Sequence, residues 1–564
     1  MPFSQLSIPF SSHPWAHGAE DLKYSTTVPS DDQLRPSQSH PLQMELPAWA
    51  PVVAVALATV LFLRSILARR SRRPSKTLPG PKPWPIIGNF NLLGALPHRS
   101  LYALSKRYGP LMRVQFGSYP VVVASSVDMA KFFLKTHDLA FIDRPKMAAG
   151  KHTTYNYSNI AWSPYGAYWR QARRICADEL FSARRLESFE HVRREEVHAL
   201  LRDLHGDAGQ VVKLKERLST TSLNIITRMV LGRKGVDKEV VVASGGGGGS
   251  VTTWKEFRWM LDELFLLNGV LNVGDWIPWL SWMDLQGYVR RMKRVGKMFN
   301  RFMENVAEEH NQRRQREGDA FVAKDMVDRL LQLADDPNLE VKLTRDSVKA
   351  FTQDLVAGGT ESAAVIVEWA ISELLKNPEV FAKATEELDG VIGRGRWVTE
   401  KDMAHLPYMD AIVKETMRLH MVVPLLSPRL SREDTSVDGY DIPAGTRVLV
   451  NAWTISRDPD LWDAPEEFRP ERFVGSKMDV KGQDFELLPF GSGRRMCPGY
   501  SLGLKVIQLT LANLLHGFVW RLPDGMSKEE LSMEEVFGLS TPRKFPLQAV
   551  VEPKLPAHLH SLLK

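Results

Sequence analysis

The sequence predicts one large, mainly α-helical body with small β-sheets, and three observations support this fold class. Apolar residues recur at helical spacing over long stretches, among them 182–204, 289–316, 346–376 and 403–418. Strand-like segments are short and few: 110–126 turns at Gly117, and 439–456 predicts a second hairpin that turns between Pro443 and Gly445. The hydrophobic content of 44% is enough for a large core, and no internal repeat divides the chain.

An apolar run near the amino end predicts a membrane anchor. Residues 46–63, "LPAWAPVVAVALATVLFL", carry no charge over a length that can cross a bilayer. Six bases and no acid follow between residues 64 and 76, and the positive-inside rule places that end in the cytosol. The alternatives are a buried core helix and a cleaved signal peptide, but a signal peptide carries its charge before the apolar run. We therefore expect a single-pass anchor over 44–68 with everything after it in the cytosol.

Composition divides the rest of the chain. Residues 1–43 are polar, rich in Ser, Pro and His and without periodicity, so no structure is expected there. Met44 directly precedes the anchor, which predicts that translation begins there and that the first 43 residues are a gene-model extension. Residues 69–89 are basic and then proline-rich, which predicts a stiff hinge before the body over 90–564.

Charge and cysteine content exclude several classes. Two cysteines in 564 residues cannot form a disulfide framework or a Cys-rich zinc site, so a reducing compartment is expected. The net charge of +7 comes mostly from the basic cluster after the apolar run. No nucleic-acid partner is therefore expected.

One of the two cysteines, Cys497, lies in the loop "PFGSGRRMCPGYSLG", residues 489–503. It precedes an apolar helix expected over 498–518, and helix-start amides together with Arg494 and Arg495 predict a stabilised thiolate. No histidine is near to form a nucleophilic pair, and Met496 stands where a phosphate-binding loop has its third glycine. The remaining use of the thiolate is as an axial metal ligand, with haem iron as the obvious candidate.

The ten residues 490–499, "FGSGRRMCPG", match the pattern F-x-x-G-x-R-x-C-x-G. On this motif the chain resembles the cytochrome P450 (haem-thiolate monooxygenase) family over roughly residues 78–550. The resemblance implies a haem b cofactor, with Cys497 as the axial iron ligand and Phe490 and Arg495 as cofactor-binding residues of the same loop. The anchor, the hinge and this loop are most similar to plant endoplasmic-reticulum members of the family, such as flavonoid 3′-hydroxylase and its relatives.

Two further motifs match the family in order and spacing. "KETMRLH" carries Glu415 and Arg418 three residues apart, and "FRPERF" supplies Arg472. The resemblance implies that these three form a structural network, not a catalytic one. "YWRQARR" supplies Trp169 and Arg173, and "SPRLSRED" supplies Arg429. With Arg495, these residues are expected to bind the carboxylates of the haem.

The helix expected over 346–376 carries Gly358 and Gly359 in its interior, where each costs about 1 kcal/mol relative to alanine. In the family such a segment activates oxygen, and the two small residues would leave room at the cofactor for dioxygen. The resemblance implies that Glu361 feeds a proton relay and that Ser362, where threonine is commoner, delivers protons to dioxygen.

These features predict a membrane-anchored monooxygenase of the endoplasmic reticulum. It would insert one atom of dioxygen into an apolar plant metabolite of the flavonoid or phenolic, terpenoid or fatty-acid class. The sequence holds no flavin or nicotinamide motif, so electrons from NADPH are expected through NADPH-cytochrome P450 reductase. Two alternatives stay open: a haem-thiolate isomerase or dehydratase that needs no dioxygen, and a non-catalytic, membrane-tethered haem-binding protein.

Overall fold

The computed structural model describes residues 56, 59, 77–234 and 253–563. The chain divides into two compact units, Met1–Pro74 and Ser75–Lys564. The expected extension, the anchor and the basic part of the hinge lie outside the described residues, apart from the helical Ala56 and Thr59. The description below concerns the second unit.

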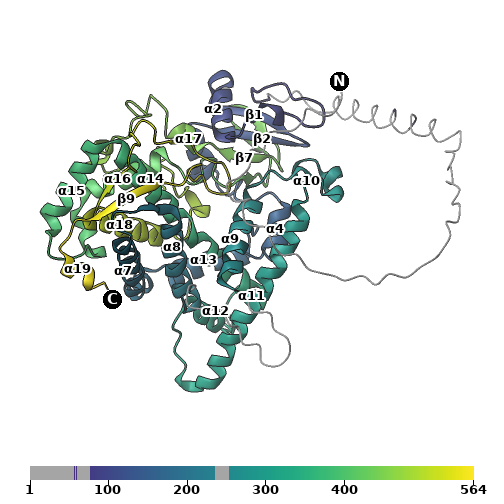
Figure 1. Cartoon of the computed structure of the whole chain (residues 1–564). Coiled ribbons are helices and arrows are strands. Elements are labelled where there is room, and N and C mark those ends of the chain that lie inside the picture. The colour runs from purple at the N-terminus through teal and green to yellow at the C-terminus, as the bar shows by residue number, and fades with distance from the viewer. Residues whose placement is uncertain (1–55, 57–58, 60–76, 235–252, 564) are drawn as a thin grey trace, which may run out of the picture. The chain divides into compact units, whose positions relative to one another are not determined.

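Helices dominate this unit (Figure 1). The predicted helical stretches are confirmed, although three of them are divided. Residues 182–204 form α6 (Ala183–Ser188) and α7 (Glu190–Gly206), and 346–376 form α13 (Arg345–Thr360) and α14 (Ser362–Lys376). The stretch 403–418 begins in a 3-10 helix (Glu400–His405) and continues as α16 (Pro407–Leu419). The other helices of eight or more residues are α2 (Pro97–Tyr108), α5 (Ala167–Ile175), α8 (Leu214–Leu231), α9 (Trp254–Gly269), α11 (Tyr288–Glu317), α12 (Met326–Ala334), α15 (Pro378–Ile392), α16 (Pro407–Leu419) and α18 (Tyr500–Gly517). Shorter ones are α3 (Val127–Lys131), α4 (Ala148–Thr153), α10 (Val273–Trp276), α17 (Ala452–Ile455) and α19 (Ala557–Ser561).

Local chemistry explains several helix boundaries. Proline occupies the first turn of α2, α15 and α16, where its missing N–H costs no helical hydrogen bond. The Thr344 hydroxyl caps α13 by accepting from the Ser347 N–H, and the Asp325 carboxylate caps α12 in the same way. Helix α8 ends at Gly232 in the left-handed conformation, with φ of 69°.

The strands form three small sheets. The largest has the order β1–β2–β7–β4, from Leu111–Phe116, Tyr119–Ala124, Arg447–Val450 and Arg429–Leu430. The others are β3–β9–β8 (Val211–Lys213, Gln548–Pro553, Phe518–Arg521) and β5–β6 (Thr435–Val437, Tyr440–Ile442). The predicted hairpin over 110–126 is confirmed as β1–β2. The one predicted over 439–456 is wrong, because β6 pairs with β5 whereas β7 runs parallel to β2.

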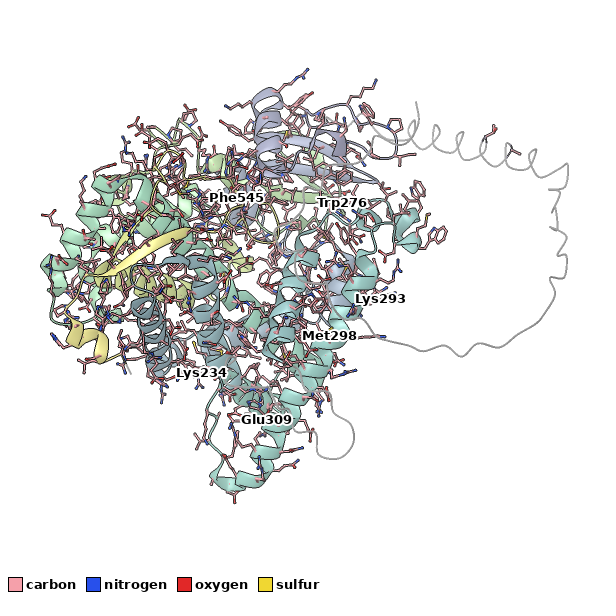
Figure 2. The ribbon with its side chains drawn as sticks, viewed as in Figure 1. Lys234, Trp276, Lys293, Met298, Glu309 and Phe545 are labelled. Atoms are coloured by element: carbon pink, nitrogen blue, oxygen red, sulfur yellow. The ribbon has the colours of Figure 1, made fainter. Side chains whose placement is uncertain are left out.

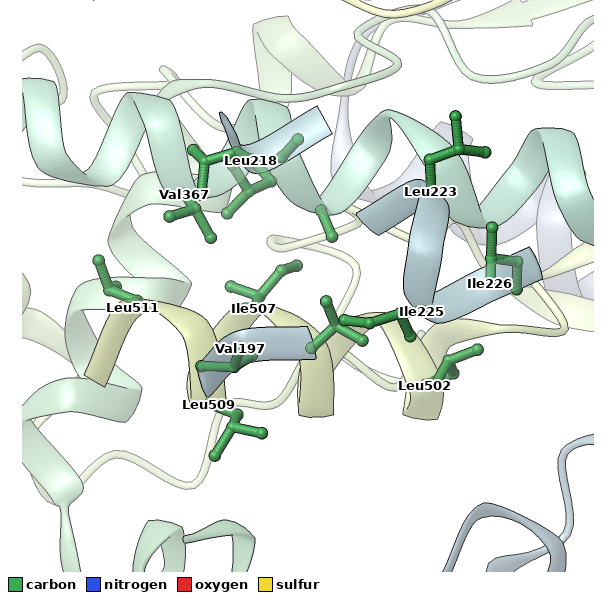
Figure 3. Close-up of a cluster of buried hydrophobic side chains, with 14 of the residues drawn as sticks. Val197, Leu218, Leu223, Ile225, Ile226, Val367, Leu502, Ile507, Leu509 and Leu511 are labelled. Atoms are coloured by element: carbon green, nitrogen blue, oxygen red, sulfur yellow. The ribbon is translucent and has the colours of Figure 1, made fainter. Parts of the chain in front are cut away.

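The core lies between the central helices. Helix α8 packs on α7, α13 and α14, and α14 also packs on α18. Figure 3 shows side chains from this region, such as Val197, Ile226, Val367 and Ile507, all of them at most 3% exposed. Among the described residues, one helix, Arg345–Lys376, is long and apolar enough to cross a membrane, by length and composition only. Most of it is buried in the protein, and it is the central helix of this core.

The proline-rich part of the expected hinge lies against the first sheet. The Arg113 N–H donates to the Pro79 carbonyl (2.8 Å), and a Cβ added at Gly80 would lie 1.9 Å from the Arg113 carbonyl oxygen. On the other side of the hairpin, Trp276 of α10, labelled in Figure 2, packs its ring 5.5 Å from that of Phe116. The β1–β2 hairpin is therefore contacted by a segment that precedes it in the sequence and by another that follows it.

Candidate active site

The loop that carries Cys497 is held in place by its own backbone. The Cys497 N–H donates to the Phe490 carbonyl (3.0 Å), and Gly491 and Gly493 adopt φ values of 70° and 69°. A Cβ added at Gly493 would lie 1.9 Å from the carbonyl oxygen of Leu134. Glycine is required there, because the loop presses against the π-helical turn Phe132–Thr136.

The expected stabilisation of the Cys497 thiolate by the protein alone is wrong. Burial raises the pKa of the thiol, and the opposing effects of the Gly499 N–H and of Arg173 are smaller. The two loop arginines point elsewhere: Arg494 pairs with Asp138, and Arg495 donates to backbone carbonyls. Coordination to a metal ion would favour the thiolate form of this sulfur.

Arg495 uses three of its five N–H donors on backbone carbonyls. It donates to the carbonyls of Ile142 (3.0 Å), Ile160 (3.2 Å) and Ser163 (2.6 Å). Its guanidinium lies over the ring of Trp169, 4.3 Å from the centroid. The Trp169 indole N–H donates to the Ile160 carbonyl (3.2 Å) and so helps to fix the loop that contains Ile160.

Further arginines gather around Arg495, and the nearby carboxylates Asp138 and Asp143 only partly offset their charge. Burial, with the repulsion between neighbouring arginines, lowers the pKa of Arg495 to about 9, and burial lowers that of Arg429 to about 10. Arg144 shows the same effect, with Arg429 and Arg495 as its charged neighbours. Sequence alone does not identify Arg144 as a member of the cluster, because a single arginine in "IDRPKM" carries no recognisable motif.

One nitrogen of this arginine cluster has no hydrogen-bond partner among the described residues. The nearest carboxylates are used by other arginines: Asp138 pairs with Arg494, and Asp143 pairs with Arg432. The Nη1 atom of Arg429 is buried and has no hydrogen-bond partner. Within the described residues Arg173 forms no hydrogen bond or ion pair and lies 5.9 Å from the Trp169 ring centroid. Buried cations of this kind fit a ligand with carboxylate groups.

The two glycines of α13 differ in their surroundings. Gly358 is exposed, and a Cβ added to it would meet nothing within 4 Å. A Cβ at Gly359 would lie 2.6 Å from the side chain of Ile226 on α8. The expectation that both leave room at the cofactor is therefore wrong for Gly359, whose small size serves helix packing.

The expected acid and alcohol lie at the break between α13 and α14. Ser362 is exposed on the same side as Gly358, and its hydroxyl donates to the Gly358 carbonyl (3.3 Å). Glu361 separates the two helices and points to other elements. It accepts from the Ser540 hydroxyl (3.0 Å) and lies 3.9 Å from the Lys215 ammonium. The two side chains are neighbours in sequence but face different partners.

The three network residues meet as the sequence predicts. Arg418 donates twice to the Glu415 carboxylate, at 2.7 and 2.8 Å, and both side chains are 0% exposed. Arg472 donates to the same carboxylate at 3.0 Å. None of the three is hydrogen-bonded to the Cys497 loop among the described residues, which agrees with a structural use.

Comparison with known proteins now adds to this geometry. The family model described as cytochrome P450 matches residues 78–547. The chain belongs to the cytochrome P450 family. Its mainly helical fold with small sheets matches a zebrafish cytochrome P450 solved with abiraterone, at a TM-score of 0.67 and 26% identity, covering 81% of this chain and 100% of the other.

Curated relatives match over nearly their whole length. The chain is 54% identical to trimethyltridecatetraene synthase of Zea mays, covering 91% of this chain and 95% of the relative. It is 52% identical to dimethylnonatriene synthase of Zea mays (90% and 98% covered). It is 42% identical to flavonoid 3′-monooxygenase of Petunia hybrida (90% and 99% covered). The chain is thus a haem b-dependent P450 monooxygenase of plant metabolism that depends on a redox partner reductase.

Proposed function

We propose that this P450 is a single-pass endoplasmic-reticulum enzyme that oxidises an acyclic terpenoid, with electrons from NADPH-cytochrome P450 reductase. The observation that carries the substrate class is the identity of 54% and 52% with two maize enzymes. Their names denote methyl-branched acyclic polyenes. Identity to the flavonoid 3′-monooxygenase is lower, at 42%.

The proposal assigns roles to the site residues. The Cys497 sulfur would bind the haem iron, and Phe490 belongs to the same loop. The arginines Arg173, Arg429 and Arg495, with Trp169, hold the haem carboxylates, and the unpartnered Nη1 of Arg429 supports this use. Haem b bound there supplies the redox-active iron that activates dioxygen.

Proton supply is assigned to the break between α13 and α14. The Ser362 hydroxyl faces open space beside Gly358, so it can hold water next to a substrate and donate a proton there. Glu361 is placed to receive protons from the side of Lys215 and Ser540. The network of Glu415, Arg418 and Arg472 supports the loops without taking part in the chemistry.

A second part of the proposal concerns the membrane. We assign residues 44–68 to the anchor, 69–89 to the hinge, 90–564 to a cytosolic catalytic domain, and no role to 1–43. Two segments of the body each expose two of its large apolar side chains: Trp84 and Ile86 (62% each) in one, and Trp279 (58%) and Trp282 (81%) in the other. Tryptophan favours the interface between lipid and water. Both segments are tied to the β1–β2 hairpin, through the Gly88–Phe116 bridge and the Ser118 N–H bond to the Trp276 carbonyl (2.8 Å).

The activity test uses membranes that contain the full chain and the reductase. Acyclic branched terpene alcohols, flavonoids and fatty acids are supplied with NADPH, and products are identified by gas and liquid chromatography with mass spectrometry. We expect turnover of a terpene alcohol that needs both NADPH and dioxygen, and none with Cys497→Ala. Turnover without NADPH and dioxygen would instead support an isomerase. Hydroxylation of flavonoids alone would refute the terpenoid assignment.

Carbonate extraction tests the membrane assignment. A protein that starts at Met44 should remain in the membrane pellet, whereas one that starts at Lys76 should be released. If the Met44 protein is extracted, the anchor assignment is wrong.

A further inference from the structure

A carboxylate on α13, the helix that carries Gly358, binds the loop that also contacts the arginine cluster. Asp354 precedes Gly358 by four residues on α13, so the two lie on one face of this helix. Its carboxylate accepts three hydrogen bonds from one loop, from Asn159 Nδ2 (2.7 Å), the Ile160 N–H (2.7 Å) and the Ala161 N–H (3.3 Å).

The same loop holds Arg495 from its other side. The Ile160 carbonyl accepts from both Trp169 and Arg495, each at 3.2 Å, and the Ser163 carbonyl accepts from Arg495 at 2.6 Å. The Ser163 N–H in turn donates to the Asn159 carbonyl (3.1 Å). The Ile160 N–H is therefore bonded to Asp354, and the Ile160 carbonyl is bonded to Arg495. A displacement of Asp354 would move Ile160 and, with it, an acceptor of Arg495.

This arrangement is not built for stability. Within the described residues no cation pairs with Asp354, and burial raises its pKa to about 6 against the effect of its three donors. The titratable groups that act on it or respond to it from α5 and the following turn are Tyr168 and Cys176, whose pKa values burial raises to about 12. An ionised, partly buried carboxylate without a counter-charge costs free energy, and such a cost is typical of a site where geometry matters more than stability.

We propose that Asp354 is a positioning residue: it fixes the loop 159–163 so that the carbonyls of Ile160 and Ser163 aim Arg495 at a haem carboxylate. The proposal rests on the role assigned to Arg495 above. In this proposal Asp354 acts through the loop that its carboxylate binds and not by contact with the haem. Haem retention would then depend on a residue of α13.

The test measures haem loss from the purified full-length holoenzyme to excess apomyoglobin. Asp354→Asn keeps the size of the side chain but replaces one acceptor oxygen by an NH₂ group that faces donors. Losing a hydrogen bond to a charged group corresponds to about a tenfold faster haem transfer. The matched control is Asp346→Asn on the same helix, an exposed carboxylate paired with Lys349, which should stay within about twofold of the wild type.

A double-mutant cycle with Arg495→Lys separates positioning from general weakening. If Asp354 acts through Arg495, the two substitutions together should accelerate haem loss little more than Arg495→Lys alone. Effects that multiply, or an Asp354→Asn rate within twofold of the wild type, would overturn the proposal. Unchanged haem loss in Arg495→Lys alone would instead refute the role of Arg495. Should Asp354→Asn purify without haem, Asn159→Ser, which removes one donor to the carboxylate, enters the same cycle.

Discussion

Replacing Glu415 by alanine tests whether a residue remote from the substrate decides how much active enzyme forms. Arg418 is 0% exposed and has five N–H donors, and all five are used. Two go to the Glu415 carboxylate, and the others go to the carbonyls of Ser456 and Pro465, each at 2.7 Å, and of Glu467 at 3.1 Å. One guanidinium thus joins α16 to the segment that follows α17.

The magnitude follows from what Glu415→Ala leaves behind. Arg418 keeps a buried charge with no carboxylate, and Arg472 loses its bond to Glu415. The Arg469 N–H, which donates to the same oxygen at 2.8 Å, loses its acceptor as well. Removing one partner from a buried charge network costs about 3–5 kcal/mol. That is a large part of the roughly 5–15 kcal/mol that stabilises a folded domain.

The assay is the carbon-monoxide difference band of the reduced protein, measured per milligram of purified chain. We expect Glu415→Ala to yield little haem-loaded protein. Glu386→Ala, which removes an exposed carboxylate on α15, should load like the wild type. Haem loading of Glu415→Ala equal to that of Glu386→Ala would refute the argument that this network supports the fold around the cofactor.

Three further predictions address α13 and its end. Gly359→Ala should lower the free energy of unfolding in urea by about 1–3 kcal/mol, because its Cβ would overlap Ile226, whereas Gly358→Ala should not lower it; equal midpoints for the two variants would contradict the packing argument. Ser362→Ala should retain haem and NADPH use but form less product per NADPH, while Ser362→Thr should preserve that ratio; an unchanged ratio in Ser362→Ala would mean that another group delivers the proton. The raised pKa of Asp354 means that its contribution to stability is largest in acid and is lost as the pH rises through about 6. Between pH 7.5 and pH 5 the wild type should therefore gain about 1.4 kcal/mol of unfolding free energy relative to Asp354→Asn, and parallel pH profiles for both would contradict the raised pKa.

Short sequence segments were sufficient to predict those features that depend mainly on residues close together in the chain or on short motifs. The helical periodicities, the β1–β2 hairpin and the meeting of Glu415, Arg418 and Arg472 were all predicted from short motifs. The prediction of a hairpin over 439–456 was wrong because it rested on the turn motif alone. A Pro-Ala-Gly turn looks alike whether the following strand folds back or crosses to another sheet, and the parallel pairing of β7 with β2 depends on residues over three hundred positions away.

The parts of the site that sequence could not supply are set by tertiary contacts. Three of the five acceptors of Arg418 are backbone carbonyls, which every residue possesses, so no side-chain pattern reveals them. Arg144 enters the cluster only because its loop passes beside Arg429 and Arg495. The different surroundings of Gly358 and Gly359 likewise depend on where α8 lies, which two adjacent glycines cannot report.

The site is nevertheless where the chain departs most often from the rules that stabilise a fold. A central helix breaks at Glu361, three residues after the exposed Gly358. Several arginines cluster with only distant carboxylates to offset their charge, and Asp354 is held by amides, with no cation paired to it in the described part of the chain. Each departure costs stability in the protein alone, and the arginines would recover theirs on binding a ligand with carboxylates. Asp354 would not, because its donors are already bound to it. Its cost persists in the holoenzyme, which is why we assign it to the placement of Arg495 and not to the binding of haem itself.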